Sequence, residues 1–231
     1  MKIVFTPDWF LTADILIEVF SFIILTVFFI LSEKSYKITK KKNTFYLGLG
    51  FLLIAIAELA TILTKFVLYY DTTVTQNIGV MAVSYHVLKS VDIFYYMGFF
   101  LHRILTLLGL YLIYRIPFNE KSGRDVILTI FFLIVSVIFS NTAYYIFHLT
   151  AFIILLLILD KYRNVYHENK NKNTKLLLNA FVLLTTSQVV FLLSKVQLLY
   201  VFAQTVQLIS YLMLLVLAIR LFKYGKQENS K

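Results

Sequence analysis

A lysine-rich segment between two long apolar runs constrains this chain most strongly. The segment Glu33–Asn43 reads EKSYKITKKKN and sets five lysines against one acid. Short lysine-rich loops beside membrane spans stay on the cytoplasmic side, because moving them across the membrane is costly. We therefore predict that this segment is an internal loop, and its position orients the whole chain.

The composition indicates an integral membrane protein. Apolar residues make up 60% of the chain and the mean hydropathy is +0.81, whereas soluble proteins contain roughly 45–50% apolar residues. The net charge of +10 is explained by basic internal loops, so no nucleic-acid partner is expected. The absence of cysteine excludes disulfides, thiolate metal sites and cysteine catalysis. The first apolar run carries Asp14 and Glu18 and has no small-residue cleavage site, so it is predicted to be a membrane span and not a signal peptide.

Two apolar stretches are too long to be single spans. As one helix, 126–159 would measure about 51 Å and 176–222 about 70 Å, while the hydrocarbon core is about 30 Å thick. Natural turns at 140–142 and 194–197 divide each stretch, and the division keeps the strongly basic loops on one side of the membrane.

The resulting fold prediction is an all-α bundle of seven transmembrane helices, with the N-terminus outside and the C-terminus cytoplasmic. It forms one domain over 1–231 with no soluble domain, and no internal repeat is evident. The predicted spans are about 9–31, 45–69, 83–114, 126–139, 143–159, 176–193 and 198–222.

Ionisable residues inside the predicted spans gather in the first three. Each costs roughly 2.5–3.5 kcal/mol at the centre of a span, so each calls for a partner or a function. Helical spacing places them on stripes, such as Asp14, Glu18 and Ser21 along the first span. Gln204, Gln207 and Tyr211 form a similar neutral stripe on the seventh span. The predicted ligand or ion cluster consists of Asp14, Glu18, Glu58, Lys65, Lys89, Asp92, Arg103, Gln204 and Gln207.

Depth in the membrane divides the charged residues into two predicted tiers. Glu18, Glu58 and Arg103 lie near the midplane, and we expect the first three spans to be mutual neighbours with Arg103 paired to one of these acids. The outer tier consists of Asp14, Lys65, Lys89 and Asp92. Three interpretations remain open: ion pairs that only lock helices together, an outward-facing polar pocket for a small polar ligand or a cation, or a path for protons or ions.

Histidines and helix breakers limit other functions. His102 and His148 could be haem axial ligands if they lay at matched depth on facing helices. No spacing typical of a metal site appears, and no cofactor is expected. The chain has seven glycines and two prolines, which favours a rigid bundle over a carrier with broken helices.

One stretch carries a resemblance to known proteins. YKITKKKNTFYLGLGFLLIAIAELA, from Tyr36 to Ala60, resembles small standalone seven-helix membrane proteins of archaea and bacteria. It also resembles the seven-helix sensor regions of some histidine kinases, although no kinase or other output domain follows it here. The resemblance implies a prokaryotic cell-membrane protein, not an enzyme, that binds a small ligand or senses a signal through a separate effector protein. The alternatives are a small proton or cation transporter or channel that uses the acidic cluster, and a haem-binding membrane protein.

Overall fold

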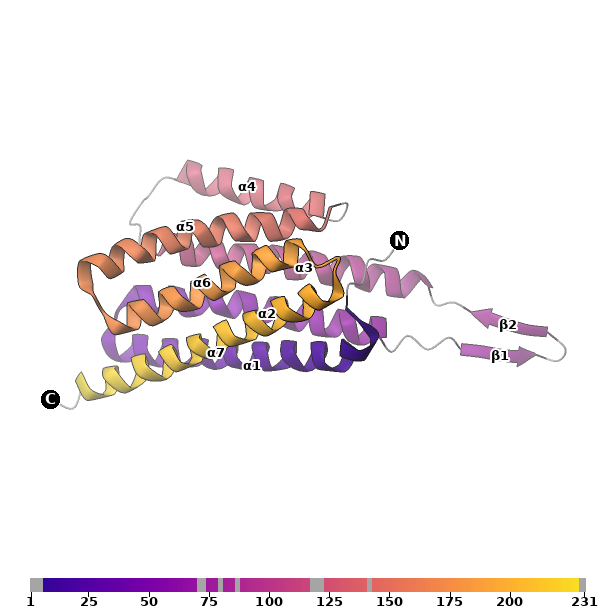
Figure 1. The fold of residues 1–231 in the computed structure, drawn as a ribbon, viewed down its shortest axis with the longest axis horizontal. Helices are drawn as coiled ribbons and strands as arrows, with labels where there is room; N and C mark the ends of the chain where they lie inside the picture. The colour runs from indigo at the N-terminus through magenta and orange to yellow at the C-terminus, as the bar shows by residue number, and fades with distance from the viewer. Residues whose placement is uncertain are drawn as a thin grey trace.

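The computed structural model describes residues 6–69, 74–78, 81–85, 88–116, 123–140 and 143–228. It consists of helices that run lengthwise along one bundle and a hairpin that projects from one end (Figure 1). The elements are a short 3-10 helix (Asp8–Phe10), α1 (Leu11–Thr39), α2 (Lys42–Tyr69), β1 (Val74–Ile78), β2 (Met81–Tyr85), α3 (Leu88–Arg115), α4 (Gly123–Ser140), α5 (Tyr145–Asn169), α6 (Lys172–Leu192) and α7 (Gln197–Glu228). The two strands are antiparallel, with Val74 opposite Tyr85.

Within the described residues, six helices are long and apolar enough to cross a membrane: α1, α2, α3, α5, α6 and α7. The apolar part of α4 found among the described residues, Thr129–Ser140, is shorter. The predicted multi-pass helical bundle is therefore confirmed, with seven helices of which six have the length and composition of membrane spans.

Both predicted breaks between helices are confirmed, although Asn141 and Thr142 of the first predicted turn lie outside the described residues. α4 ends at Ser140 and α5 begins at Tyr145, while α6 ends at Leu192 and α7 begins at Gln197. Each turn lies in a short run of polar or small residues between apolar stretches, where a single helix would have been too long for the membrane.

The ends of several helices differ from the predicted spans. α1 continues to Thr39 and α2 begins at Lys42, so most of the predicted lysine-rich loop is helical. Lysine and glutamate favour helix almost as well as leucine does, so a basic segment can prolong a helix beyond its apolar part. The third predicted span also begins too early, because residues 83–85 belong to β2 and α3 begins at Leu88.

The helix packing forms a closed arrangement. α2 packs against α1 and α3, and α6 packs against α5 and α7. Contacts of α1 with α7 and of α3 with α5 join these two groups, while α4 lies outside against α3 and α5. The prediction that the first three helices are mutual neighbours is thus wrong in one respect, because in the part of the chain that the structure describes α1 and α3 each pack on α2 and have no comparable contact with each other.

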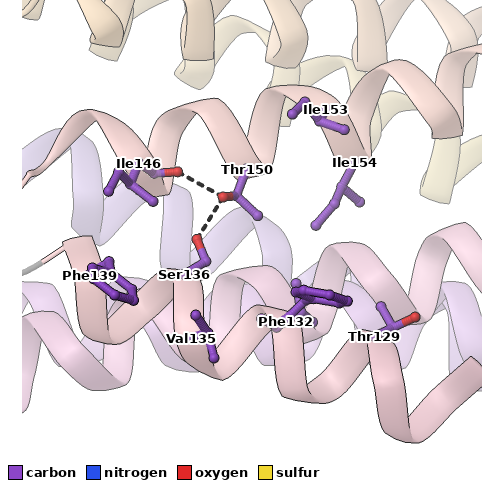
Figure 2. A pocket seen from close by; sticks show the side chains of 10 residues that line it. Thr129, Phe132, Val135, Ser136, Phe139, Ile146, Thr150, Ile153 and Ile154 are labelled. Carbon is purple, nitrogen blue, oxygen red and sulfur yellow. Dashed lines mark hydrogen bonds between the residues drawn. The ribbon is translucent and has the colours of Figure 1, made fainter.

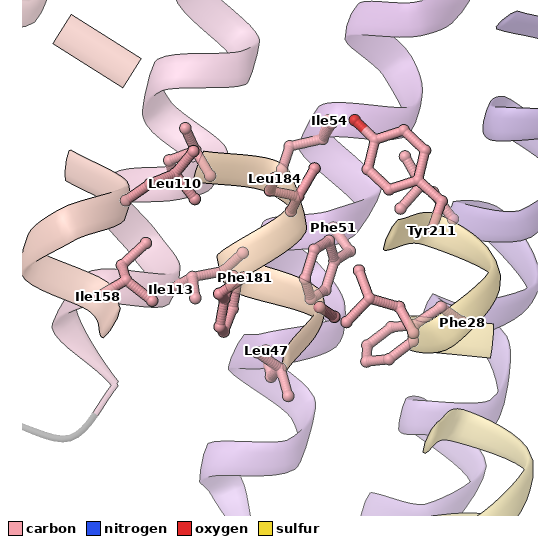
Figure 3. Packing of buried hydrophobic residues seen from close by; sticks show 14 of the residues in the cluster. Phe28, Leu47, Phe51, Ile54, Leu110, Ile113, Ile158, Phe181, Leu184 and Tyr211 are labelled. Carbon is pink, nitrogen blue, oxygen red and sulfur yellow. The ribbon is translucent and has the colours of Figure 1, made fainter. Parts of the chain in front are cut away.

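Aromatic rings occupy the centre of the bundle (Figure 3). Phe28 of α1, Phe51 of α2 and Phe181 of α6 are fully buried. The ring centroids of Phe28 and Phe51 are 4.8 Å apart, and those of Phe51 and Phe181 are 6.2 Å apart in stacked geometry. These contacts fix α1, α2 and α6 against one another on the side of the bundle where α1 joins α2.

Candidate functional site

Two polar stripes predicted from helical spacing are buried in the bundle. Asp14 and Glu18 on α1 are 0% and 3% exposed, and Glu58 and Lys65 on α2 are 3% and 5% exposed. α1 and α2 pack side by side, so the two stripes face a shared interior and not the lipid.

The ammonium group of Lys65 lies at the centre of this interior. It donates to Asp14 Oδ2 at 2.6 Å, to Glu18 Oε1, and to the hydroxyl oxygen of Tyr200 at 3.0 Å. A lysine ammonium has three N–H donors, so these three acceptors use all of them. A side chain of the protein itself thus fills the centre of the site.

α7 closes the site with neutral polar groups. The Tyr200 hydroxyl donates to Asp14 Oδ1 at 2.9 Å, and Gln204 Nε2 donates to the Tyr200 oxygen at 3.1 Å. The N-terminal segment adds a further contact, because Thr6 Oγ1 donates to Asp14 Oδ2 at 3.2 Å. Lys65 therefore joins α1, α2 and α7 through one network.

Glu58 forms a second group next to the first. Its Oε1 atom accepts from Gln207 Nε2 at 3.1 Å and from the Tyr211 hydroxyl at 3.2 Å. Gln207 Nε2 also donates to the Tyr211 oxygen at 3.0 Å. The charge of Glu58 acts on Glu18, so the two groups form one electrostatic unit, which we call the polar cluster: Asp14, Glu18, Glu58, Lys65, Tyr200, Gln204, Gln207 and Tyr211.

The polar cluster contains more acid than base. Among the described side chains, its three carboxyl groups face one ammonium, and all four of these groups are nearly or fully buried. Within the described residues, Glu18 Oε2 is a buried oxygen that has no hydrogen-bond partner. A buried carboxylate that lacks a partner is costly, so the site gains free energy by taking up positive charge at this oxygen.

The structure combines the two predicted tiers into one cluster. Lys65, predicted for the outer tier, is ion-paired with Glu18, predicted for the midplane. The expected pairing of Arg103 with Glu18 or Glu58 finds no support among ion pairs between described residues, which join Glu18 to Lys65. Arg103 is half-buried on α3. Lys89 and Asp92 belong to the first turns of α3, and their side chains lie outside the described part of the structure.

Three members of the network, Tyr200, Tyr211 and Thr6, were not among the predicted site residues. Tyr211 belongs to the predicted neutral stripe with Gln204 and Gln207, and Tyr200 precedes Gln204 by four residues, so the same stripe extended by one turn would have included it. Helical spacing does not predict Thr6, because this residue precedes the first helix. The N-terminal segment brings its hydroxyl group to Asp14.

The two histidines considered for haem lie apart from this network. His102 Nδ1 is 3.2 Å from the carbonyl oxygen of Ala57, and His148 Nδ1 is 2.9 Å from Gln188 Oε1. Both rings contact Phe147, with centroids 5.7 Å and 5.0 Å away. Each histidine therefore has a polar partner in the protein, and haem ligation by this pair stays a prediction.

A separate apolar pocket of about 440 Å³ lies between α4 and α5 (Figure 2). Its walls are mostly phenylalanine, leucine, isoleucine and valine side chains. Its polar groups are satisfied internally, because Ser136 Oγ and Thr150 Oγ1 are 2.6 Å apart and Thr150 donates to the carbonyl oxygen of Ile146 at 2.8 Å. None of the residues that line it belongs to the polar cluster.

Comparison of the chain with protein-family models, with curated proteins and with solved structures gives no match.

Proposed function

We propose that this chain is a seven-span membrane protein of the sensor or small-ligand-binding type, with a proton as the ligand of the polar cluster. It is a non-enzymatic protein of the prokaryotic cell membrane in this proposal, with the N-terminus outside. It would act through a separate effector protein at its cytoplasmic end. The observation that supports the proposal best is the buried excess of carboxyl groups over ammonium, together with the free Oε2 atom of Glu18.

The geometry favours a proton over a larger ligand. The side chains that a ligand would contact bond to one another, and Lys65 already gives its three N–H groups to protein oxygens. A metal cation such as Ca²⁺ needs 6–8 oxygen ligands, whereas a proton needs the one oxygen that stays without a partner. Proton uptake at Glu18 would also reduce the electrostatic repulsion between the carboxyl groups of Glu18 and Glu58.

Continuous helices connect the polar cluster to the opposite end of the bundle. α1 runs without a break from Asp14 to Thr39, and α7 runs from Tyr200 beyond Arg220. A change in the bonds of the cluster can therefore shift the ends of these helices, where an effector would bind.

Infrared difference spectroscopy tests for the bound proton. We expect the purified protein in lipid nanodiscs to show a carbonyl band of a protonated carboxylic acid that shifts in D₂O, because the cluster holds a proton. Glu18→Gln should remove or displace this band. Glu33→Gln is the matched control, since Glu33 is part of an exposed ion pair with Lys37 and should leave the band unchanged.

Two results would contradict the proposal. One is the absence of any protonated carboxyl band in the wild-type protein. The other is a band that survives Glu18→Gln unchanged. A thermal stability that depends on sodium or potassium at constant ionic strength, without such a band, would indicate a metal cation as the ligand instead.

A second candidate function is proton or cation transport, and one observation favours it. The hydrogen bonds from Tyr200, Gln207 and Tyr211 reach from α7 to groups on α1 and α2. They cross between helices that are far apart in the sequence, which is where coupling sites of transporters are usually found.

A further inference from the structure

Two parts of the chain share a sequence pattern at a constant spacing. Phe-Ile-Ile-Leu occurs at 22–25 and at 152–155, and Lys-x-Lys-Asn-Thr occurs at 40–44 and at 170–174. The numerical offset between the copies is the same in both cases, and it continues through α2 and α6. The identical pairs between the second motif and Tyr200 are Leu47/Leu177, Phe51/Phe181, Leu53/Leu183, Leu63/Leu193, Lys65/Lys195, Leu68/Leu198 and Tyr70/Tyr200.

The local backbone repeats together with the sequence. Lys40 and Lys170 are the two non-glycine residues with positive φ in the described chain, at 55° and 46°. The N–H of Lys40 donates to the carbonyl oxygen of Tyr36 at 2.8 Å, and that of Lys170 donates to Tyr166 at 2.7 Å. A left-handed lysine at a helix end is uncommon, because glycine or asparagine normally takes this position. Its recurrence at equivalent positions indicates that the two helical hairpins have a common origin.

The packing has the same two-fold pattern. α2 lies against α1 and α3 in one group, and α6 lies against α5 and α7 in the other. The two contacts between the groups are also equivalent, since α1 packs on α7 and α5 packs on α3. In Figure 1 the three helices α5, α6 and α7 lie in front of α3, α2 and α1.

The contact between Phe51 and Phe181 locates the two-fold axis that relates the two groups of helices. They occupy equivalent positions in the two hairpins, are both fully buried, and stack with their ring planes 16° apart. A residue that contacts its own counterpart lies on a two-fold axis. Because α1 and α5 run in the same direction (Figure 1), this axis follows the length of the helices and would stand perpendicular to the membrane.

The charges are confined to one of the two copies. The counterparts of Glu18 and Glu58 are His148 and Gln188, which are hydrogen-bonded to each other at 2.9 Å. The counterpart of Lys65 is Lys195, which lies exposed in the turn between α6 and α7. The first copy therefore provides the carboxyl groups and the ammonium, and the second copy provides the neutral α7 groups that bond to them.

We infer that α1–α3 and α5–α7 are two copies of one three-helix unit joined by α4, and that a proton bound at Glu18 crosses the membrane when the units rock about the Phe51–Phe181 contact. The inference rests on the proton site proposed above. Parallel repeats with a membrane-normal axis and a polar site at their interface are an arrangement found in transporters that move by rigid-body rocking. Rocking of intact units needs no broken helix, which agrees with the scarcity of glycine and proline.

The transport step involves one bond at a time. A proton from water on one side forms an O–H bond at Glu18 Oε2, and the same bond breaks when the proton passes to water on the other side. The charged and titratable groups that face this carboxyl are Asp14 from α1, Lys65 and Glu58 from α2, and Tyr200 and Tyr211 from α7. Protonation removes one negative charge beside the hydrogen bonds that Tyr200 and Tyr211 of the second unit make with Asp14 and Glu58 of the first, and the change in these bonds frees the units to move.

Proton flux in proteoliposomes tests the inference. With an imposed potassium diffusion potential, we expect a trapped pH dye to report proton entry with the wild-type protein. Glu18→Gln should reduce the rate at least tenfold, and Glu33→Gln should leave it unchanged. An infrared carboxyl band without proton flux would overturn transport while the proton site stands, whereas the loss of both would overturn the site itself. Uptake of radioactive sodium without proton entry would overturn the proton as the transported ion.

A second experiment tests whether the interface between the units is the moving boundary. The chain has no cysteine, so Ser21→Cys, on the buried stripe of α1, provides a single reporter. Tyr211→Phe removes a hydrogen bond to Glu58 across the interface and should raise the labelling rate about tenfold with an impermeant thiol reagent, since bonds to charged groups are among the stronger ones.

Ser210→Ala is the matched control for this experiment. Ser210 is the neighbour of Tyr211 on α7, and its hydroxyl donates to the carbonyl oxygen of Ala180 at 2.7 Å, within the second unit. Its removal should leave the labelling rate of Ser21→Cys close to that of the parent. Equal acceleration by Ser210→Ala and Tyr211→Phe would contradict rocking at this interface.

Discussion

Lys65 determines how the buried acids of this bundle can coexist. Its ammonium group donates hydrogen bonds to the carboxyl oxygens Asp14 Oδ2 and Glu18 Oε1 and to the hydroxyl oxygen of Tyr200. An ion pair in a low-dielectric interior adds little net stability compared with apolar residues, but removal of one partner leaves a buried charge without compensation. Lys65 is therefore a residue whose loss should cost far more than an average surface ion pair.

The corresponding prediction concerns stability. Lys65→Met should lower the free energy of unfolding by about 3–5 kcal/mol, because Asp14 loses its counterion and Glu18 Oε1 loses its hydrogen-bond donor. Unfolding in mixed detergent micelles would measure the change. Lys37→Met breaks an exposed ion pair with Glu33 and should cost about 0.3–0.5 kcal/mol.

A double variant separates the loss of charge pairing from the loss of packing. Asp14→Asn in the Lys65→Met background should recover part of the lost stability, since Asp14 is ion-paired with Lys65 and one buried negative charge is removed with its partner. If the double variant is as unstable as the sum of the single variants, the carboxylate of Asp14 was not the source of the cost.

At the same scale, the burial of the charged residues was predictable from the sequence, whereas their ion-pair partners were not. The spacing of Asp14, Glu18, Glu58 and Lys65 placed them on stripes, and their burial confirms those stripes. The partner of Glu18 was misassigned to Arg103, because depth along a helix leaves the direction of each stripe around the helix axis undetermined. That direction depends on packing between helices, which one sequence does not contain.

At the scale of elements, α2 and α3 approach closely where two glycines face each other. A Cβ atom added to Gly109 would lie 2.6 Å from the carbonyl oxygen of Gly50 and 2.8 Å from Cγ1 of Ile54. Small residues at such contacts allow helix backbones to approach in membranes, where dispersion and close packing hold helices together. The glycines therefore set the distance between α2 and α3.

Gly109→Ala tests this close contact. Alanine favours helix by about 0.5–1 kcal/mol over glycine, yet overpacking typically costs about 1–3 kcal/mol. We expect a net loss of stability, measured by thermal unfolding in detergent. Leu101→Ala, on an exposed part of α3, should change the unfolding temperature less. A rise in stability with Gly109→Ala would mean that α2 and α3 separate at no cost.

The boundaries of these elements were predictable only in part. The helix breaks predicted at 140–142 and 194–197 followed from the limit that membrane thickness sets on helix length. The continuation of α1 to Thr39 and of α5 to Asn169 did not follow, because hydropathy marks where a segment stops being apolar and not where it stops being helical. Lysine-rich segments are good helix formers. The end of the apolar segment and the end of the helix therefore fall several residues apart.

At the scale of the whole molecule, the duplication was hidden by the composition of the helices. Matches between apolar positions in leucine-rich and isoleucine-rich helices carry little information, because any two such helices share many of them by chance. The Lys-x-Lys-Asn-Thr motifs became informative once both were located at left-handed helix ends, and once Phe51 and Phe181 were found in contact. Three-dimensional equivalence thus identified a repeat that the sequence alone left ambiguous.

The last prediction concerns the orientation of the bundle in the membrane. α6 has a turn at each end, with Asn171 exposed at one and Val196 exposed at the other. The first turn lies among the basic residues that the positive-inside rule places in the cytoplasm, next to Lys170 and Lys172, whereas the second contains a single lysine. In intact cells, Val196→Cys should react with an impermeant thiol reagent and Asn171→Cys should react only after the membrane is permeabilised. Because the chain contains no cysteine of its own, each signal reports one position. The opposite labelling pattern would show that the orientation of the bundle is inverted, with the Thr6–Asp14 end of the polar cluster facing the cytoplasm.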